Sequence, residues 1–284
     1  MPHGAELMPT PTASQWRGGT ITACMRLKLT VEYAGTRYSG WQIQKNARTV
    51  QGELDRAIRE STGAREIELY GSGRTDAGVH ALAQVAHLEI ETHTSPETLR
   101  RRVNDLLPSD IVVLSVEKVH RRFHARHDAV ARSYLYQVSR RKTAFAKAFV
   151  WWVKDPLDAG AMRSAARGFV GFHDFQSFSD DDPAEKSTEV VLETLDVHED
   201  DDLIVFHVEG SHFIWKMVRR LVGVLVAIGR GDLSPDEGVS LLKERSDLPA
   251  RLTAPAAGLF LERVYYDGDR RDLPVRTAAR VLSI

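Results

Sequence analysis

Cysteine is almost absent from this sequence: Cys24 is the only one among 284 residues. A single thiol cannot form an intramolecular disulfide or supply the cysteine set of a structural zinc site, so both kinds of scaffold are excluded. Long hydrophobic runs are also lacking. The most apolar later stretch, 217–228, is about a dozen residues long and contains two arginines, whereas a membrane span needs about twenty apolar residues. These absences predict a cytoplasmic protein that does not span a membrane.

The first 24 residues lack the features of a targeting signal. They contain Glu6, carry little positive charge and have no continuous apolar segment, so they match neither a secretory signal nor an arginine-rich transit peptide. We therefore predict that residues 1–24 are a disordered leader. A strand pattern begins just after Met25, so we expect that Met25 is the native start or that the leader is dispensable for folding.

An excess of positive charge is missing as well, because the net charge is −1. Any nucleic-acid footprint must therefore be local. The acidic residues gather at 180–182 and 199–202, which we expect to be solvated turns. The middle of the chain is rich in basic residues, which bind phosphate or simply form a hydrated surface. They are Arg100, Arg101, Arg102, Arg121, Arg122, Arg126, Arg132, Arg140, Arg141 and Lys142.

Hydrophobic periodicity divides the rest of the chain into two halves with a similar order of elements. Residues 27–33 alternate between apolar and polar, as in a half-buried strand, whereas Val50, Leu54 and Ile58 recur at helical spacing. The first half is expected to contain a strand at 27–33, a helix from 50 to about 63, strands at 67–70 and 84–90, a helix from 95 to 108 and a strand at 111–119. The second half is expected to contain a strand at 133–138, a helix around 162–169, strands at 190–197 and 203–208, a helix at 217–228, a shorter one opened by a capping box at 234–237, and a strand at 259–266.

This order predicts an α+β fold built from two pseudo-symmetric halves. Each half approximates the ferredoxin-like arrangement that RNA-recognition modules share, with antiparallel sheets meeting at a central cleft. We expect an N-terminal domain at 25–128, a C-terminal domain at 129–268 and a tail at 269–284. Because this topology serves many functions, the function must be argued from the site.

The most distinctive segment is the glycine-rich sequence GSGRTDAGVH at 71–80. It is not a dinucleotide-binding motif, because Asp76 stands where the third glycine is needed, and it lacks the Lys-Ser or Lys-Thr of a P-loop. What remains is a carboxylate between small residues, with Arg74 two positions before it. From local chemistry alone, Asp76 either caps a tight turn or acts on a ligand.

Residues 73–80, GRTDAGVH, resemble the signature loop of the tRNA pseudouridine synthase A (TruA) family. The resemblance extends over nearly the whole chain from Met25, in the same order. Further matching segments are YAGTRYSGWQ at 33–42, TVQGEL at 49–54, FHAR at 123–126, the strand with Tyr134, the late helix with Phe213, Met217, Arg219 and Gly223, and Gly258 with Leu259. The sequence GFHDF at 171–175 resembles a structural segment of the family.

The resemblance implies a role for each matching residue. Asp76 would be the catalytic carboxylate, Tyr134 would stack on the flipped uracil and move a proton, and Arg219 would pair with Asp76. Arg74 would hold the uridine out of its stack, and Leu259 would form a wall of the base pocket. We also expect three further residues at the substrate. They are His80, Arg121 and Arg126.

The implied reaction converts uridine to pseudouridine at positions 38, 39 and 40 in the anticodon stem-loop of tRNA, without a metal or organic cofactor and in a homodimer. Whether Asp76 attacks covalently or removes a ribose proton stays open. Two other readings are a non-catalytic RNA-binding protein of the same fold and a glycoside hydrolase. A hydrolase of this kind needs a second placed carboxylate, which the loop does not supply.

Some residues depart from the family pattern or have simpler explanations. Taken singly, Tyr134 fits a core aromatic and Arg219 a surface residue. Trp215 and Lys216 precede the Met-Val-Arg run where the family has a histidine. The histidines at 120, 124 and 127 could bind a transition metal, but the basic residues among them favour RNA contact.

Overall fold

The computed structural model describes residues 24–281. The predicted leader lies outside the described residues, apart from Cys24, which is the first residue of a strand. The N-terminal half consists of β1 (Cys24–Tyr33), α1 (Val50–Thr62), β2 (Ile67–Gly71), β3 (His80–Glu91), α2 (Pro96–Leu106) and β4 (Ile111–Lys118), with a short 3-10 helix η1 (Gly35–Arg37) after β1.

The two helices of this half begin and end where their capping residues stand. The Thr49 side chain accepts a hydrogen bond from the Gly52 N–H at the start of α1, and Gly63 ends it in the left-handed conformation (φ 71°). The Ser95 side chain caps α2 in the same way, with Pro96 in the first turn. The sequence predicted α1 from its apolar periodicity and its end near Gly63, and α2 from the Ser95-Pro96 start and its apolar stripe.

The C-terminal half follows the same plan with several additions. Its main elements are β5 (Ala129–Ser139), α3 (Ala159–Phe169), β8 (Glu189–Asp200), β9 (Leu203–Gly210), α4 (Met217–Arg230) and β10 (Leu259–Tyr266). The added elements are β6 (Trp151–Trp152), β7 (Gly171–Asp174), η2 (Gln176–Phe178), α5 (Pro235–Ser240), α6 (Leu248–Arg251) and η3 (Ala256–Gly258). The short helix predicted from the capping box at 234–237 is α5, and both capping-box hydrogen bonds are present. The two- to four-residue elements were not predicted, because such short segments carry no periodicity.

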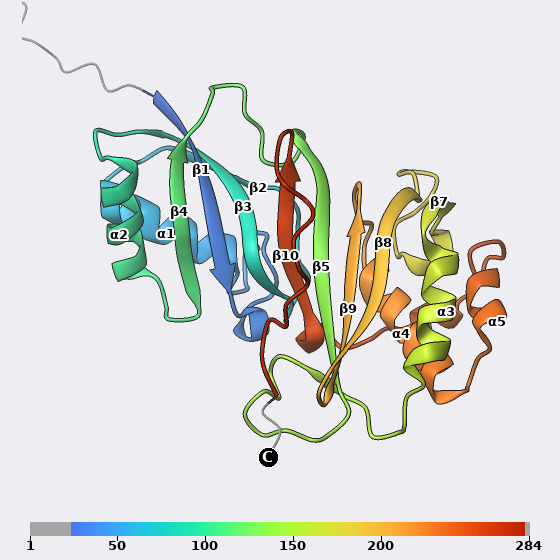
Figure 1. Cartoon of the computed structure of the whole chain (residues 1–284). Helices are drawn as coiled ribbons and strands as arrows, with labels where there is room; N and C mark the ends of the chain where they lie inside the picture. The colour runs from blue at the N-terminus through green and yellow to red at the C-terminus, as the bar shows by residue number, and fades with distance from the viewer. Residues whose placement is uncertain (1–23, 282–284) are drawn as a thin grey trace, which may run out of the picture.

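The halves join into one ten-stranded sheet, in which eight strands follow the order β4-β1-β3-β10-β5-β9-β8-β7 (Figure 1). The other two lie off this path: β2 pairs with β3, and β6 pairs with β5. Each half contributes antiparallel neighbours in the same relative order: β4-β1-β3-β2 in the first and β10-β5-β9-β8 in the second. The α+β fold with two pseudo-symmetric halves is thereby confirmed. The two sheets meet edge to edge, because β10 pairs with β3 in parallel at His80 and Ala81.

This junction determines where the glycine-rich loop lies. β2 pairs with residues 86–90 of β3, and β10 pairs with residues 80–81 of the same strand. Since β1 occupies the other edge of β3, β2 and β10 share one edge and the sheet forks between them. The loop 72–79, which connects β2 to β3, therefore lies at the fork, between the two halves.

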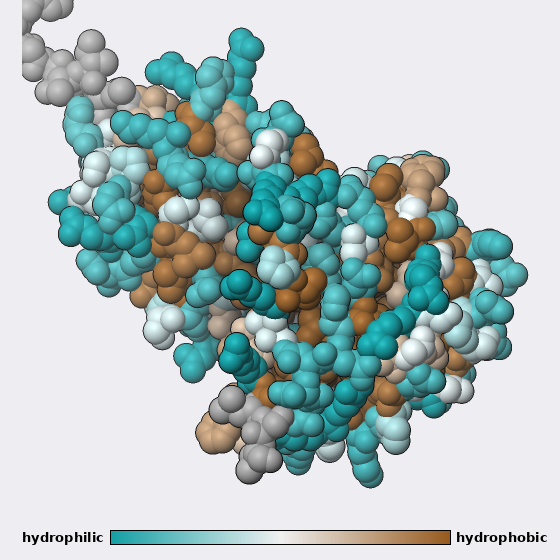
Figure 2. All heavy atoms as spheres, viewed as in Figure 1, coloured by the Kyte–Doolittle hydropathy of each residue, from teal (hydrophilic) through white to brown (hydrophobic). Residues whose placement is uncertain are grey.

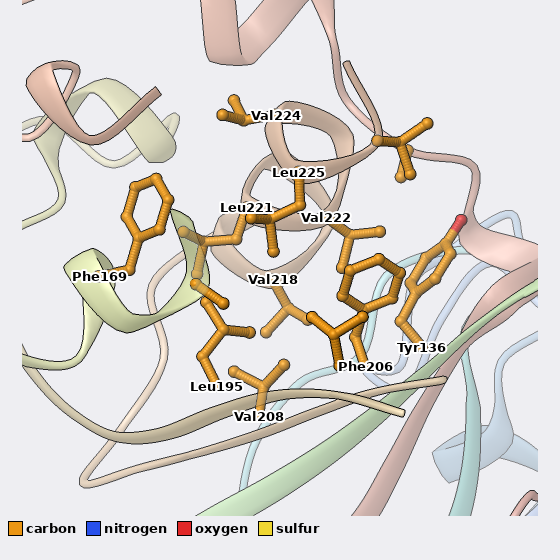
Figure 3. Close-up of a cluster of buried hydrophobic side chains, with 14 of the residues drawn as sticks. Tyr136, Phe169, Leu195, Phe206, Val208, Val218, Leu221, Val222, Val224 and Leu225 are labelled. Carbon is orange, nitrogen blue, oxygen red and sulfur yellow. The ribbon is translucent and has the colours of Figure 1, made fainter. Parts of the chain in front are cut away.

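Helices of both halves cover one face of the sheet, and α1 and α4 pass behind the strands in Figure 1. α4 is buried on nearly every side and packs with α3, β8 and β9 in the core shown in Figure 3. Gly223 lets α4 approach the chain at 252–254, because a Cβ there would stand 1.8 Å from the Leu252 carbonyl oxygen. No helix within residues 24–281 combines the length and the apolar character that crossing a membrane would take.

The segment after β10 runs back along that strand on the other face of the sheet (Figure 1). The Gln137 side-chain oxygen accepts hydrogen bonds from the backbone N–H groups of Ala278 and Ala279, and Val281 is buried against Leu135 and Phe260. The predicted tail is thus docked as far as Val281. Figure 2 shows hydrophilic residues over most of this face, with hydrophobic residues visible in separate small areas.

Candidate active site

The first half of the loop at the fork is anchored by side-chain hydrogen bonds. The Ser72 hydroxyl donates to the Gln84 side-chain oxygen at 2.7 Å, and the Gln84 amide donates to the Gly73 carbonyl at 3.1 Å. The hydroxyls of Thr75 and Tyr33 are hydrogen-bonded at 2.8 Å. Ser72 and Thr75 are buried, whereas the intervening Arg74 is exposed. The loop is therefore a fixed support for the residues beside Thr75.

A second segment, residues 38–41 after β1, holds the loop through backbone hydrogen bonds. The Trp41 N–H donates to the Thr75 carbonyl at 3.1 Å, and the Gly78 N–H donates to the Tyr38 carbonyl at 3.2 Å. Gly40 lies between these contacts with a φ of 89°, and a Cβ there would stand 2.5 Å from the Thr75 oxygen. The YAGTRYSGWQ sequence thus positions Asp76 through backbone contacts.

Both carboxylate oxygens of Asp76 have a donor. Arg219 Nη1 lies 3.4 Å from Oδ2, and Trp215 Nε1 donates to Oδ1 at 3.2 Å. The pairing with Arg219 that the family resemblance implied is present. The side chains of Asp76 and Arg219 are only 28% and 17% exposed, so water screens this pair less than it screens a surface ion pair.

Arg219 is held in place from a second direction. Its Nε donates to the Ala254 carbonyl at 2.7 Å, and the Ala254 N–H donates back to the Arg219 carbonyl at 3.0 Å. Arg219 stands in the first turn of α4, half-buried. It is thus not a simple surface residue, since its planar guanidinium bridges α4, the 252–254 segment and Asp76.

Tyr134 and Tyr136 share one face of β5 but have different surroundings. Tyr136 is fully buried and its hydroxyl donates to the Pro255 carbonyl at 2.7 Å. Tyr134 is half-buried, and its ring meets Phe213 edge to face at 4.9 Å. Burial raises the pKa of Tyr134 to about 12, against the opposing effect of Arg132 and with a smaller contribution from Asp76. Its hydroxyl is therefore protonated at neutral pH.

Leu259 is the first residue of β10 and lies opposite Tyr136 in the sheet register. It is buried in the same hydrophobic core against which Tyr134 packs. A leucine here adds an apolar side chain, without a polar group, to the core on which Tyr134 packs.

Arg74 and Arg126 come together although they are far apart in sequence. Both line a small hollow beside the open edge of β2, together with the exposed ring of Tyr70 and the side chain of Gln42. Arg126 belongs to the β4–β5 link, residues 119–128. Arg121 is exposed on the same link but does not line this hollow.

Arg132 organises this region, and its role was not predicted from the sequence. Its guanidinium donates to four backbone carbonyls, at distances from 2.9 to 3.3 Å. These carbonyls belong to Ser72, Arg126, Ala129 and Ser211. Arg132 thus ties the start of the loop at the fork to the β4–β5 link and to the segment before α4. Among many arginines in this stretch, nothing in the sequence distinguished it.

His80 does not lie at a surface that RNA could reach. Its side chain is 1% exposed and stacks on Phe260 at 4.8 Å. Nδ1 accepts the Gly35 N–H, so the protonated Nε2 faces the carbonyls of Ala148 and Ala257 at 3.0 and 3.2 Å. The expected substrate contact is replaced by a structural one, because burial and three backbone partners occupy both ring nitrogens.

The histidines of the β4–β5 link are arranged for turns and ring packing. His124 Nδ1 accepts the N–H groups of Arg126 and His127, and the rings of His124 and His127 lie 4.2 Å apart. Within residues 24–281, no three His, Cys, Asp or Glu side chains are grouped to hold a metal ion.

The acidic residues expected in solvated turns lie mostly at the surface, and several of them are also paired. Asp180 contacts Lys216 at 2.6 Å and also Arg220, whereas Asp181 accepts the Trp215 N–H at 3.0 Å. At the other turn, acidic residues pair with basic residues of the middle of the chain, which reduces the free positive charge there. These pairs are Arg140 with Glu199, Arg163 with Glu199, and Arg141 with Asp202.

The assembled site places an oriented carboxylate beside a neutral phenol at the junction of two half-sheets. A carboxylate with donors on both oxygens can act as a nucleophile or as a base, and a protonated tyrosine can donate a proton. The neighbouring apolar side chains can exclude water from a reacting base.

Comparison with known proteins gives this arrangement its context. A family model described as tRNA pseudouridine synthase matches residues 29–128 and 165–267. The tRNA pseudouridine synthase A of Nitrobacter hamburgensis is 42% identical over 244 residues, which is 85% of this chain and 99% of the relative. The tRNA pseudouridine synthase A 2 of Clostridium tetani is 36% identical over 245 residues, which is 85% of this chain and 98% of the relative. The chain therefore belongs to the tRNA pseudouridine synthase family.

Proposed function

We propose that this protein isomerises uridine to pseudouridine at positions 38, 39 and 40 in the anticodon stem-loop of tRNA. The observation that carries the proposal is the contact of Arg219 with Asp76, at the centre of the GRTDAGVH loop. The choice of these three positions rests on the resemblance to the TruA family.

The reaction breaks the N1–C1′ glycosidic bond, turns the uracil and forms a C5–C1′ bond, after which the C5 proton is lost and N1 gains a proton. Asp76 either attacks the nucleotide or removes a ribose proton, and both routes need an ionised carboxylate. Arg219 contacts one oxygen of this carboxylate and keeps it oriented. We assign Asp76 and Arg219 to this catalytic step.

Tyr134 and Leu259 are proposed to enclose the flipped base. The half-buried Tyr134 ring can stack on uracil, and its protonated hydroxyl can exchange a proton with the detached base. Leu259 supplies an apolar wall on the neighbouring strand. A dry pocket is useful here because the detached uracil must rejoin the ribose before water intervenes.

Arg74 and Arg126 are proposed to bind the RNA beside the target. Both line the hollow next to Tyr70, where guanidinium groups and an exposed ring suit phosphates and unstacked bases. Arg121 is assigned to the phosphate backbone farther along the same link. His80 receives no RNA contact in this proposal, because it is buried.

The proposed partner is tRNA, and the proposed assembly is a cytoplasmic homodimer that needs no metal or organic cofactor. The family resemblance supports the homodimer. A dimer would allow one RNA to contact both subunits.

The test is incubation of the purified protein with unmodified tRNA, followed by carbodiimide treatment and primer extension to locate pseudouridine. We expect product from the wild type and none from Asp76→Ala, with Asp76→Asn as the variant of nearly equal volume. Failure of the wild type to modify any tRNA would contradict the proposal, as would full activity of Asp76→Ala. Tight tRNA binding without product would favour the non-catalytic RNA-binding protein.

A further inference from the structure

Trp215 departs from the family pattern and touches the proposed catalytic carboxylate directly. Its indole N–H donates to Asp76 Oδ1 at 3.2 Å, on the oxygen that Arg219 does not contact. The side chain is 50% exposed, so it lies at the surface beside the proposed site. The contact joins the segment before α4 to the loop at the fork.

The backbone of Trp215 is fixed by the acidic loop, residues 180–182. Its N–H donates to Asp181 Oδ2 at 3.0 Å, and the next residue, Lys216, adopts the left-handed conformation with a φ of 63°. A non-glycine residue takes this conformation at a cost, so the surrounding contacts must hold it. Lys216 makes such contacts through Asp180 at 2.6 Å and through the Trp215 ring, whose centroid lies 4.8 Å from the ammonium.

We infer that Trp215 is a positioning residue that fixes the plane of the Asp76 carboxylate. The terminal torsion of an aspartate is broad, so one donor on Oδ2 leaves the other oxygen free to turn. The second donor on Oδ1 removes this freedom. An indole suits the task because it donates one hydrogen bond and accepts none, so it can hold only an acceptor such as a carboxylate.

This inference assigns the acidic loop a part in the site. Asp181 orients the Trp215 backbone, and Trp215 in turn orients Asp76. The proposal rests on the proposed function in one respect, since it predicts the rate of pseudouridine formation. Its structural part concerns the contact itself and can be measured without RNA.

The sharpest test replaces Trp215 with benzothienylalanine, which keeps the shape of the ring and exchanges the N–H for sulfur. We expect the single-turnover rate on bound tRNA to fall about tenfold, because a hydrogen bond to a charged group is lost at a partly exposed site. The tRNA dissociation constant should stay within about twofold. The matched control is the same replacement at Trp152, another exposed tryptophan with a lysine ammonium over its ring. An unchanged rate at position 215, or a change in the dissociation constant alone, would overturn the inference.

The conservative pair at position 181 tests the support for Trp215. Asp181→Asn keeps an oxygen that can accept the Trp215 N–H, so it should retain most of the rate, whereas Asp181→Ala should lower it as the Trp215 replacement does. Equal rates for the two variants would count against a role in positioning.

A measurement on the RNA-free protein keeps the two proposals separable. The indole N–H signal of Trp215, assigned by its absence from Trp215→Phe, should shift in Asp76→Ala, while the signal of Trp152 should not. A stationary Trp215 signal would overturn the inference even if the enzyme makes pseudouridine. A shifted signal would support the contact even if the wild type modified no tRNA.

Discussion

Arg219 makes two contacts through two different nitrogens of one planar group. Its Nε reaches the Ala254 carbonyl while Nη1 reaches Asp76. Lysine carries its donors on one rotatable nitrogen at the end of a flexible stem, so it can keep the charge but not this fixed arrangement of donors. The geometry of the guanidinium, more than its charge, therefore orients the carboxylate.

We expect Arg219→Lys to lower the single-turnover rate by about a hundredfold, in line with the loss of one preorganised donor at an active site. Binding of tRNA, measured by filter retention, should change little. Arg263→Lys is the control, because Arg263 is an exposed arginine of β10. A rate within a few-fold of the wild type would remove Arg219 from the orienting role.

Single residues also mark the limit of prediction from sequence. Alternation placed Tyr134 and Tyr136 on one face of β5, but only packing against η3 and α4 separates the buried Tyr136 from the half-buried Tyr134. The family motif brought His80 into the predicted site, whereas the parallel pairing of β3 with β10 buries it. Such contacts depend on how the two halves meet, which no local pattern records.

At the scale of elements, α4 is the support on which the site is built. It carries Arg219 at its first turn and approaches the 252–254 segment through Gly223. The sequence predicted this helix and most of the longer strands because their apolar periodicity is strong. It did not predict that the acidic loop at 180–182 would bind the start of α4, because a run of charges looks the same in a hydrated turn and in a paired one.

Gly223→Ala should push α4 away from the 252–254 segment. The added Cβ would meet a backbone oxygen, which cannot move aside as a flexible side chain can. We expect a loss of stability of about 1–3 kcal/mol by urea denaturation, together with a reduced rate. In Gly229→Ala, on the same helix, the Cβ meets the flexible Met162 side chain, so the loss should be clearly smaller. Equal losses would mean that helix propensity, not the contact with Leu252, decides the outcome.

The β4–β5 link, which carries Arg121 and Arg126, is attached to β3 through His87. His87 Nδ1 accepts the Ala125 N–H at 3.1 Å. Burial, reinforced by nearby Arg26 and His124, lowers the pKa of His87 to about 4. Because the unfolded histidine has a pKa of about 6.5, its contribution to stability is complete above that value and is lost as pH falls toward 4.

Stability should therefore decrease between pH 6.5 and 4 more steeply in the wild type than in His87→Gln, which has no titrating group at this position. Urea denaturation at a series of pH values measures the difference. The variant is expected to be less stable than the wild type at pH 7, so the comparison concerns the slope with pH. Parallel slopes would show that other groups dominate the acid response.

On the scale of the whole molecule, two similar half-sheets meet along one parallel contact, and the proposed site lies at their junction. The repeat of strand and helix order was readable from the sequence, but the edge at which the halves join was not. β3 and β10 are separated by most of the chain and pair over only two residue positions. Beside this short pairing, Arg132 links the two halves through the carbonyls of Ser72 and Ser211.

The net charge of −1 means that RNA attraction must come from a local surface, so its salt dependence should be modest and assignable to few residues. We expect replacement of Arg121 and Arg126 together by alanine to weaken tRNA binding and to flatten the slope of log K against log salt by about one to two units. Arg140 and Arg141 replaced together form the control, because both pair with acidic residues of the β8–β9 turn. A slope that stays the same in the Arg121 and Arg126 variant, or falls equally in the control, would place the RNA-binding surface on another part of the molecule.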